Sequence, residues 1–318
     1  MMVVLSSLEL ERAADLIRSG QLVAFPTETV YGLGASVFHT EAVASIFQVK
    51  GRPSDNPLII HVHSVEQVEE VACEIPPIFY ELVDAFWPGP LTCVLKRHPR
   101  VPFSVSAGLE SVAVRMPSHP VALELIRLVQ APLVAPSANL SGKPSPTCLS
   151  HVLEDFQGKI AAVVEGGESE FGIESTVVSL LGEKPVLLRP GSITRERLEE
   201  RLNCTIEVAH GIPTGPVLSP GMKYRHYAPK CPIVIVETLD ELSEKLLYPL
   251  KGKRMVLSHS ALNFFASNTV FHLLSAKNLY SLLRVSDSEG VEEIVVLCDS
   301  AMQQDAALMN RLIKAAAP

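Results

Sequence analysis

Short apolar runs that alternate with helix-like stretches constrain the fold of this 318-residue chain more than any other feature of its sequence. Runs such as Leu22–Phe25 and Leu58–Val62 have the length and composition of buried strands. Residues 6–18 and 40–50, in contrast, place their apolar side chains on one helical face. Because strands that alternate with helices form α/β folds, we predict an α/β fold whose larger part has a mixed, twisted sheet with flanking helices. Further strands are expected at Leu91–Leu95, Val112–Arg115, Leu133–Ala135, Ala161–Val164, Thr176–Leu180 and Val186–Arg189.

A segment dense in proline and glycine, residues 211–232, divides the chain into two parts. We predict a large domain at residues 1–210, an ordered linker at 211–232 and a small Rossmann-like α/β domain at 233–318. Strands of the small domain are expected at Ile233–Glu237, Arg254–Leu257, Thr269–Leu273 and Glu293–Cys298, with helices at Leu239–Leu247 and Ala306–Ala316.

Composition and charge narrow the class of protein. The chain has 27 basic and 35 acidic residues, a net charge of −8, which disfavours broad binding to a nucleic-acid backbone. The six cysteines are scattered without a CxxC pair, so we predict free thiols rather than a zinc site or disulfides. The N-terminus lacks the basic region of a signal peptide and the sequence lacks a membrane-spanning run, so a cytoplasmic location is expected.

Four polar loop clusters are the candidates for function, because binding and catalytic residues concentrate on loops that a rigid sheet holds in place. They are PTETVYGLG (26–34), KGRPSDNPL (50–58), PSANLSGKPS (136–145) and GGESEFGIESTVV (166–178), the last followed by LRPG (188–191).

Two of these loops carry groups that suit phosphate. Lys50 and Arg52 combine a point charge with a fork of donors, although a solvated pair at a helix C-terminus is the commoner explanation for such cations. Ser137, Asn139 and Ser145 lie on a loop that follows an apolar strand, where hydroxyl and backbone N–H groups can hold an anion. An ordinary polar turn would have the same composition.

The ends of the strands carry further candidates. Arg115 and Arg189 each end an apolar strand, where an arginine either clamps a carboxylate or phosphate or forms a salt bridge at the rim of the sheet. His61 lies within a strand, a position more often occupied by a core histidine than by a ligand-binding one. Glu28 and Glu174 could be bases or turn residues, and the sequence leaves both alternatives open.

Several common catalytic motifs do not occur. The sequence contains no Walker P-loop, no GxGxxG after the first strand, no GxSxG elbow and no HExxH helix. Fixed cations and hydroxyls remain, and these suit phosphoryl or nucleotidyl chemistry, which depends on positioning and charge stabilisation.

Taken together and in order, these segments resemble the YrdC-like family of threonylcarbamoyl-AMP synthases. The resemblance rests on the pattern K-x-R at Lys50 and Arg52, on S-x-N at Ser137 and Asn139, and on surrounding segments. Those segments are PTETVYGLG, KGRPSDNPLIIHV, WPGPLT, VAVRMP, APSANLSGKPSPT, ESTVV and LRPGSIT. SPGMKYRHYAPK resembles the linker of the longer, two-domain branch, the Sua-type proteins, so residues 1–210 would be the YrdC-like domain.

The resemblance implies a nucleotidyltransferase reaction. L-threonine and bicarbonate would form a carbamate, whose carboxylate attacks the α-phosphate of ATP and releases pyrophosphate. The product, threonylcarbamoyl-AMP, would pass to a tRNA threonylcarbamoyl transferase complex for the t6A modification of tRNA. Magnesium would bind through the phosphates of ATP rather than through protein ligands.

The resemblance also implies which residues form the site. The catalytic core would be Lys50, Arg52, Ser137 and Asn139. The ATP-binding residues would be Lys50, Arg52, Asn56, Ser137, Asn139, Ser145 and Arg189, with His226 and Tyr227 from the linker, which would close as a lid over the nucleotide. The threonine-binding residues would be Thr29, His61, Arg115 and Ser175. Because the loop that carries Lys50 and Arg52 is polar, Lys50→Ala and Arg52→Ala are each expected to abolish turnover and to leave the melting temperature nearly unchanged.

Two alternative functions belong to the same fold. The first is an RNA-binding module, which the net charge of −8 disfavours. The second is a carbamoyltransferase of metal-centre maturation, an activity that belongs to larger chains with zinc-finger and acylphosphatase segments.

Overall fold

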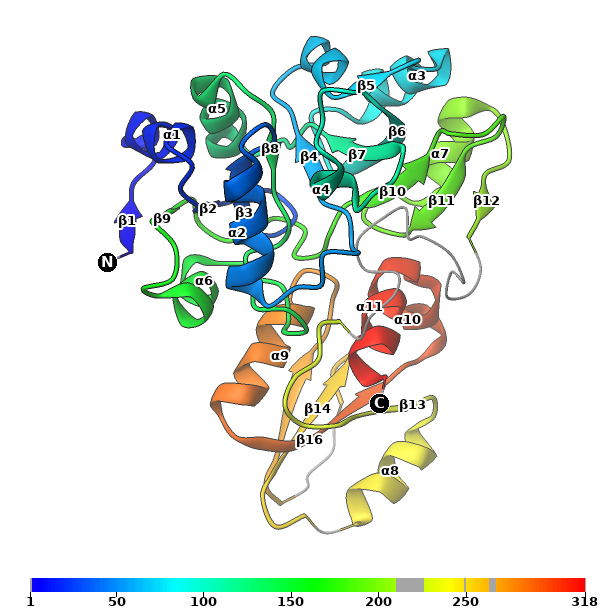
Figure 1. Cartoon of the computed structure of the whole chain (residues 1–318). Coiled ribbons are helices and arrows are strands. Elements are labelled where there is room, and N and C mark those ends of the chain that lie inside the picture. The colour runs from blue at the N-terminus through cyan, green and yellow to red at the C-terminus, as the bar shows by residue number, and fades with distance from the viewer. Residues whose placement is uncertain (1, 210–225, 249, 263–266, 318) are drawn as a thin grey trace. The chain divides into compact units, whose positions relative to one another are not determined.

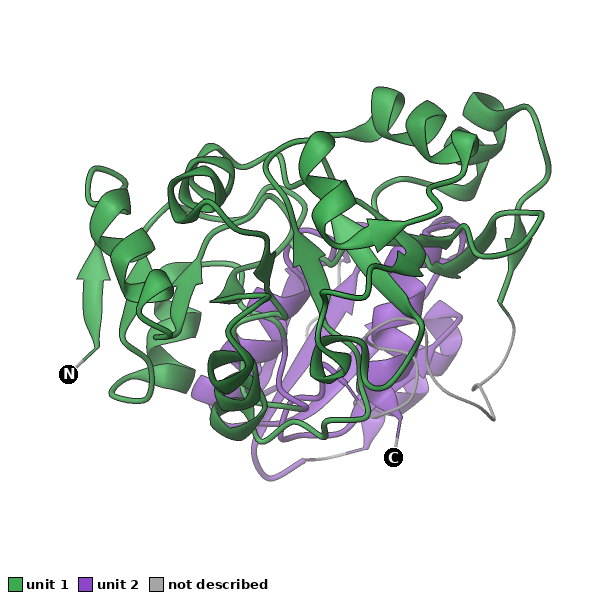
Figure 2. Cartoon of the chain, turned by 45° about the horizontal axis from the view of Figure 1, so that its top comes forward, with its two compact units in different colours: residues 1–141, 145–224 green, residues 142–144, 225–318 purple. Residues whose placement is uncertain are grey.

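The computed structural model describes residues 2–209, 226–248, 250–262 and 267–317, and the chain divides into two compact units (Figure 2). The first unit comprises Met1–Ser141 and Ser145–Tyr224. The second comprises Arg225–Pro318 together with Gly142–Pro144, three residues from one of the predicted functional loops. All six cysteines are free, as predicted.

Within its described residues, the first unit contains one sheet of 12 strands (Figure 1). Its strands are β1 (Val3–Leu5), β2 (Val23–Phe25), β3 (Gly32–Ser36), β4 (Ile59–His61), β5 (Ala72–Cys73), β6 (Leu91–Arg97), β7 (Ser111–Arg115), β8 (Leu133–Val134), β9 (Ala162–Val164), β10 (Thr176–Ser179), β11 (Val186–Arg189) and β12 (Glu207–Val208). Its helices are α1 (Leu10–Arg18), α2 (Thr40–Lys50), η1 (Glu66–Glu70), α3 (Pro77–Phe86), α4 (Phe103–Ser106), α5 (Pro120–Val129), α6 (Leu149–Phe156) and α7 (Arg195–Leu202).

The sheet is mixed, which confirms the predicted fold class. The strand order is β1-β9-β2-β3-β8-β4-β7-β6-β10-β11-β12, with β5 paired to β6. Parallel pairs such as β4 with β7 and β6 with β10 alternate with antiparallel pairs such as β6 with β7. Parallel neighbours require crossover connections, and the helices of the unit supply several of them.

Side chains of successive strand residues point to opposite faces of the sheet, so each face has its own apolar cluster. Val23 and Phe25 pack with α1 and α5, which lie side by side (Figure 1). Ala24, between them in sequence, belongs to the larger cluster on the other face, which also contains the buried side chains of α2 and α3. Helices thus bury both faces of the part of the sheet formed by the neighbouring strands β1, β9, β2, β3 and β8.

The second unit has a smaller sheet in which every described pair of strands is parallel, as in a Rossmann-like domain. Its strands are β13 (Ile233–Val236), β14 (Lys253–Ser258), β15 (Thr269–Leu273) and β16 (Val291–Leu297), in the order β13-β16-β14-β15. Its helices are α8 (Leu239–Leu247), α9 (Leu279–Ser288), α10 (Ser300–Gln304) and α11 (Ala306–Ala316).

Residues Gly142–Pro144 are held within this second unit by hydrogen bonds to its main body. The backbone N–H of Ala228 donates to the carbonyl oxygen of Gly142 over 2.9 Å. The buried side chain of Arg284, on α9, donates from Nη2 to the carbonyl oxygen of Pro144 over 2.7 Å. A short stretch of the loop between Ser137 and Ser145 therefore takes its partners from the C-terminal part of the chain.

Two local predictions were wrong. Residues 26–34 were assigned to a polar loop, yet Gly32–Ser36 forms β3. A Cβ atom at Gly34 would lie 2.7 Å from the ring of Phe25, so glycine permits β3 to pair beside that ring. Residues 66–70 form a short 3-10 helix. The helix expected from Ser6 begins only at Leu10, because the Glu9 carboxylate accepts hydrogen bonds from Ser6 but no Ser6 side chain caps the helix.

Within the described stretches, no helix is both long and apolar enough to cross a membrane.

Candidate active site

The Lys50 side chain links the end of α2 to the loop that carries Ser137 and Asn139. Gly51 ends α2 with a left-handed φ of 61°, and this turn leaves Lys50 in the last helical turn. Lys50 is only 3% exposed, and its ammonium donates to the carbonyl oxygens of both Ser137 and Asn139. In return, the backbone N–H of Ser141 donates to the carbonyl oxygen of Lys50 over 2.8 Å. The two motifs of the resemblance therefore form one hydrogen-bonded cluster.

Hydroxyl and amide groups continue this cluster. The Ser137 hydroxyl donates to Asn139 Oδ1 over 2.6 Å, and Asn139 Nδ2 donates to the carbonyl oxygen of Leu140 over 2.8 Å. Further along the chain, the buried Ser145 hydroxyl donates to Glu174 Oε1 over 2.6 Å. These contacts fix the polar side chains of the loop before any ligand binds.

Arg52 and Asn56 belong to the loop that follows α2. Arg52 Nη2 donates to the carbonyl oxygen of Pro57 over 3.1 Å, which closes this loop on itself. Asn56 is buried, and its Oδ1 atom has no hydrogen-bond partner among the described residues. A buried acceptor of this kind is commonly completed by a ligand or a water molecule.

Arg115 is the centre of a second polar cluster. It ends β7 with 3% of its surface exposed. Its Nη1 donates to the Thr29 hydroxyl over 2.8 Å, and its Nε donates to the carbonyl oxygen of Gly89 over 3.2 Å. Its Nη2 lies 2.6 Å from Oε1 of Glu28, a buried ion pair. The hydrogens on Nη1 and Nη2 that remain available are those that could grip a carboxylate.

Ser175 and Arg189 form a third cluster beside the second. Arg189 Nε donates to the carbonyl oxygen of Ser175 and its Nη2 donates to the Ser175 hydroxyl, each over 3.1 Å. The Ser175 hydroxyl also lies 2.7 Å from the hydroxyl of Thr92, a hydrogen bond in which either group can donate. All three residues are buried.

His61 is buried beside Arg115 and is neutral at ordinary pH. Burial and, secondly, the positive charge of Arg115 lower the pKa of His61 to about 3. Its Nδ1 atom has no hydrogen-bond partner in the described part of the chain. The ring therefore offers a neutral donor and acceptor, which suits a hydroxyl group better than a charged one.

Strand register brings these clusters together. Cα pairing aligns His61 with Arg115, Arg115 with Thr92, Thr92 with Val177 and Val177 with Arg189. Aligned residues on neighbouring strands share a face, so the row crosses one face of the sheet from β4 to β11. Ile59, Val94 and Ala113 each lie two positions from the residue of the row on the same strand, so their side chains point to the same face. They form a small apolar cluster there that consists of strand residues only.

The 26–34 loop connects the row to the Lys50 cluster. The backbone N–H of Ala138 donates to the carbonyl oxygen of Tyr31, and Gly32 pairs with Ser137 in an isolated bridge. On the other side, the backbone N–H of Phe171 donates to the carbonyl oxygen of Glu28 over 2.8 Å. Hydrogen bonds within the first unit thus link parts of all four predicted functional loops.

The predicted lid residues are described only in part. Tyr227 is buried in the second unit with a positive φ of 65°, and its ring lies 5.1 Å from that of Tyr280 and 5.5 Å from that of His226. The rest of the expected lid, residues 211–225, lies outside the described residues, so the lid stays a prediction.

Some residues of the site were not predicted from the sequence. Thr92 and Gly89 lie in the quoted segment WPGPLT, which received no role. Thr27, whose hydroxyl donates to the carbonyl oxygen of Val30 over 2.6 Å, orders the 26–34 loop. A threonine inside the apolar run of β6 was the available signal for Thr92, because a buried hydroxyl needs a partner.

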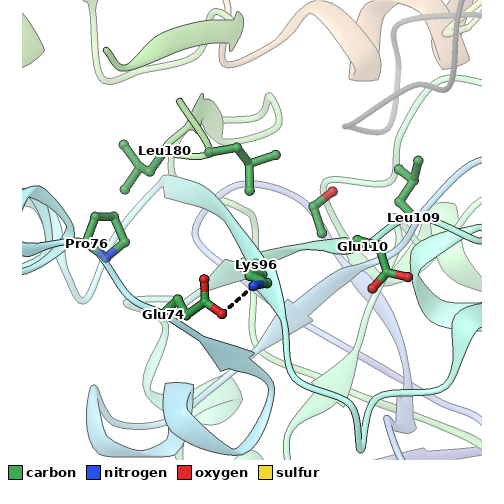
Figure 3. A pocket seen from close by; sticks show the side chains of 8 residues that line it. Glu74, Pro76, Lys96, Leu109, Glu110 and Leu180 are labelled. Carbon is green, nitrogen blue, oxygen red and sulfur yellow. Dashed lines mark hydrogen bonds and ion pairs between the residues drawn. The ribbon is translucent and has the colours of Figure 1, made fainter. Parts of the chain in front are cut away.

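A separate cavity of about 420 Å³ lies away from these residues in the first unit (Figure 3). The Lys96 ammonium and the Glu74 carboxylate form an ion pair beside it. It is lined by Glu74, Pro76, Lys96, Leu109, Glu110, Ser111, Leu180 and Leu181. None of the predicted site residues lines it.

Metal ligands are not grouped in the described residues: no set of three or more histidine, cysteine, aspartate or glutamate side chains could hold a metal ion there. A mixed α/β sheet whose loops gather lysine, arginine, serine and asparagine donors around buried side chains is typical of proteins that bind small anionic molecules.

Comparison with known proteins identifies the family. A model of the Sua5, YciO and YrdC proteins, described as "Telomere recombination", matches residues 15–191, and a model described as "Threonylcarbamoyl-AMP synthase, C-terminal domain" matches residues 193–317. The chain therefore belongs to the Sua5–YciO–YrdC family, in its two-domain branch of threonylcarbamoyl-AMP synthases. This confirms the resemblance found in the sequence.

Individual relatives match over nearly the whole chain. A threonylcarbamoyl-AMP synthase of Pyrococcus abyssi is 46% identical, with 95% of this chain and 92% of that protein covered. One of Bacillus subtilis is 43% identical, with 97% and 93% covered. The crystal structure of P. abyssi Sua5 complexed with L-threonine superposes with a TM-score of 0.91 at 42% identity, covering 99% of this chain and 97% of that one.

Proposed function

We propose that this chain is a threonylcarbamoyl-AMP synthase, which forms threonylcarbamoyl-AMP and pyrophosphate from L-threonine, bicarbonate and ATP. The observation that carries the proposal is the convergence of four loops. Hydrogen bonds between these loops link the cluster of buried Lys50, Ser137 and Asn139 to the loop that contacts Arg115, within a chain similar over nearly its full length to enzymes of that name.

The Arg115 cluster is the proposed threonine subsite. Arg115 would receive the amino-acid carboxylate, and its bonds to Thr29 and Gly89 hold the guanidinium in a fixed orientation. The neutral ring of His61 suits the threonine hydroxyl, because a hydroxyl both donates and accepts a hydrogen bond. Ser175 would contribute a further hydroxyl, and its bond to Thr92 fixes its position.

The Lys50 cluster is the proposed phosphate subsite. Lys50 and Arg52 would neutralise the phosphates, while the side chains and N–H groups around Ser137 and Asn139 would donate to their oxygens. The remaining proposed nucleotide-binding residues are Asn56, Ser145, Arg189, His226 and Tyr227. Since the described residues offer no carboxylate cage, we expect magnesium to bind through the phosphates of ATP.

Chemistry in such a site depends on placement and charge. A carboxylate oxygen of the threonine carbamate attacks the α-phosphorus, the bond to the bridging oxygen breaks and pyrophosphate leaves. Both reactants are anionic, so cations such as Lys50 and Arg52 reduce their mutual repulsion and stabilise the charge that builds up on the phosphate oxygens. Holding the two groups in line supplies further acceleration. The product would then be used by a separate tRNA-modifying complex.

The test is a pyrophosphate-release assay with mass detection of the adenylate. We expect release to require L-threonine and bicarbonate together and to stop when either is omitted. Release from ATP alone would contradict the proposal. Tight binding of tRNA without any adenylate would instead favour the RNA-binding alternative.

A further inference from the structure

The Glu28 carboxylate is a buried charge whose hydrogen-bonding capacity is unused. Glu28 is 3% exposed, and its Oε1 lies 2.6 Å from Arg115 Nη2. Neither carboxylate oxygen has a hydrogen-bond donor in suitable geometry among the described residues. A buried carboxylate is normally stabilised by several donors, since its desolvation is costly. Glu28 therefore needs an explanation beyond its single ion pair.

A second buried glutamate shows what a structural ion pair looks like in this chain. Glu293, in β16, accepts from Arg254 Nε over 2.9 Å and also pairs with Lys245 Nζ at 2.7 Å. Two cationic donors thus reach its two oxygens, and no atom of Glu293 is left without a partner. Glu28 lacks this second donor, so its environment is incomplete in a way that the environment of Glu293 is not.

Four of the described buried polar atoms that lack a hydrogen-bond partner belong to three neighbouring residues. Besides both oxygens of Glu28, they include Nη2 of Arg115 and Nδ1 of His61, and these two residues are aligned on neighbouring strands. Two hydrogen bonds hold this part of the chain in place. The Glu28 carbonyl oxygen accepts from the backbone N–H of Phe171, and the Thr29 hydroxyl accepts from Arg115. Glu28, Arg115 and His61 are therefore neighbours whose side chains retain unused hydrogen-bonding capacity, which favours a polar ligand.

We propose that Glu28 receives the α-ammonium group of the amino acid while Arg115 receives its carboxylate, an inference that rests on the proposed function. An α-amino acid carries a cation and an anion on adjacent groups, and Glu28 and Arg115 present the two complementary charges next to each other. Binding replaces one internal ion pair by two charge-assisted contacts to the substrate. The site then selects α-amino acids over the corresponding 2-hydroxy acids when the free amino acid first binds, before its amine is carboxylated.

The experiment is calorimetric titration of the full chain with L-threonine and with 2,3-dihydroxybutanoate, in which a hydroxyl replaces the amine. The wild type should bind L-threonine at least about tenfold more tightly, the size expected for one charge-assisted contact. Glu28→Gln should weaken L-threonine binding by about 10- to 100-fold and leave the affinity for the hydroxy acid within about threefold. Glu28→Asp, which keeps the charge, should restore part of the discrimination.

Two further results would overturn the inference. If Glu28 only orients Arg115, then Glu28→Gln will weaken binding of both ligands equally. If Glu28→Gln does not fold, equal binding of L-threonine and the hydroxy acid by the wild type would refute amine recognition on its own. Glu293→Gln is the matched control, since it breaks a buried pair in the second unit and should leave the L-threonine affinity unchanged.

Failure of this inference is separable from failure of the proposed function. A wild type that makes the adenylate from threonine, bicarbonate and ATP, but whose Glu28→Gln variant binds threonine normally, retains its function and loses only the role of Glu28. A wild type that neither binds threonine nor forms the adenylate refutes the function itself.

Discussion

Replacing Lys50 by alanine should destabilise the protein as well as inactivate it. The polarity of the loop predicts an unchanged melting temperature, because an exposed side chain contributes little to stability. Lys50, however, is only 3% exposed, so we expect its removal to lower the melting temperature. Its ammonium donates to the carbonyl oxygens of Ser137 and Asn139. The substitution removes both hydrogen bonds, so two buried or partly buried carbonyl groups lose their donor.

The magnitude follows from those two bonds. A hydrogen bond to a charged group contributes about 1.5–3 kcal/mol, and neighbouring bonds do not add fully. A loss of roughly 2–5 kcal/mol in the free energy of unfolding is therefore expected, which for a unit of this size lowers the melting temperature by roughly 5–15 °C. Differential scanning calorimetry measures the change, and the pyrophosphate assay on the same sample below the transition measures activity.

Two comparisons make this prediction specific. Lys50→Met keeps the aliphatic chain and removes the charge, so it should lose most of the same stability. Lys184→Ala, at an exposed position of the same unit, should change the melting temperature by less than about 2 °C. If Lys50→Ala melts within about 1 °C of the wild type, the bonds to Ser137 and Asn139 contribute nothing and the reasoning is refuted.

Three further predictions concern other parts of the chain. Burial raises the pKa of Cys93 to about 12, so iodoacetamide at pH 8 should modify the exposed Cys204 and spare Cys93. Peptide mass spectrometry measures both labelling rates, and faster labelling of Cys93 would contradict this prediction. The pKa of His61 is about 3 in the folded protein, below its ordinary 6.5, so between these values the unfolded chain binds more protons and stability falls as pH falls. Urea titrations at pH 4.5 and 7 should show a smaller difference for His61→Asn than for the wild type, and an equal difference would exclude the effect. Arg284→Ala removes the bond to Pro144 and should cost the second unit about 1–3 kcal/mol in urea unfolding, whereas an unchanged midpoint would show that the bond is not stabilising.

Local patterns in the sequence predicted most of the strands. The apolar runs at 91–95, 112–115 and 186–189 overlap β6, β7 and β11, because strand character depends on neighbouring side chains that the sequence displays directly. Thr40 and Gly51 mark the bounds of α2 for the same reason. The parallel sheet of the C-terminal part likewise follows from its alternating strands and helices.

Elements whose character depends on distant residues were missed. β3 consists largely of glycine and alanine, and only its place beside Phe25 explains why small residues are required there. α9 was not predicted, although buried residues lie along it. For β3, tertiary packing outweighs the local propensity of the segment.

The candidate site divides in the same way. The sequence by itself indicated which loops are candidates for the chemistry and, through ordered motifs such as K-x-R and S-x-N, which family the chain belongs to. Only the tertiary structure decided that His61, Arg115 and Arg189 share one row and that Glu28 lies against Arg115. The physical reason is that a motif consists of residues close together in the sequence, whereas strand register and burial arise from contacts between residues far apart in it.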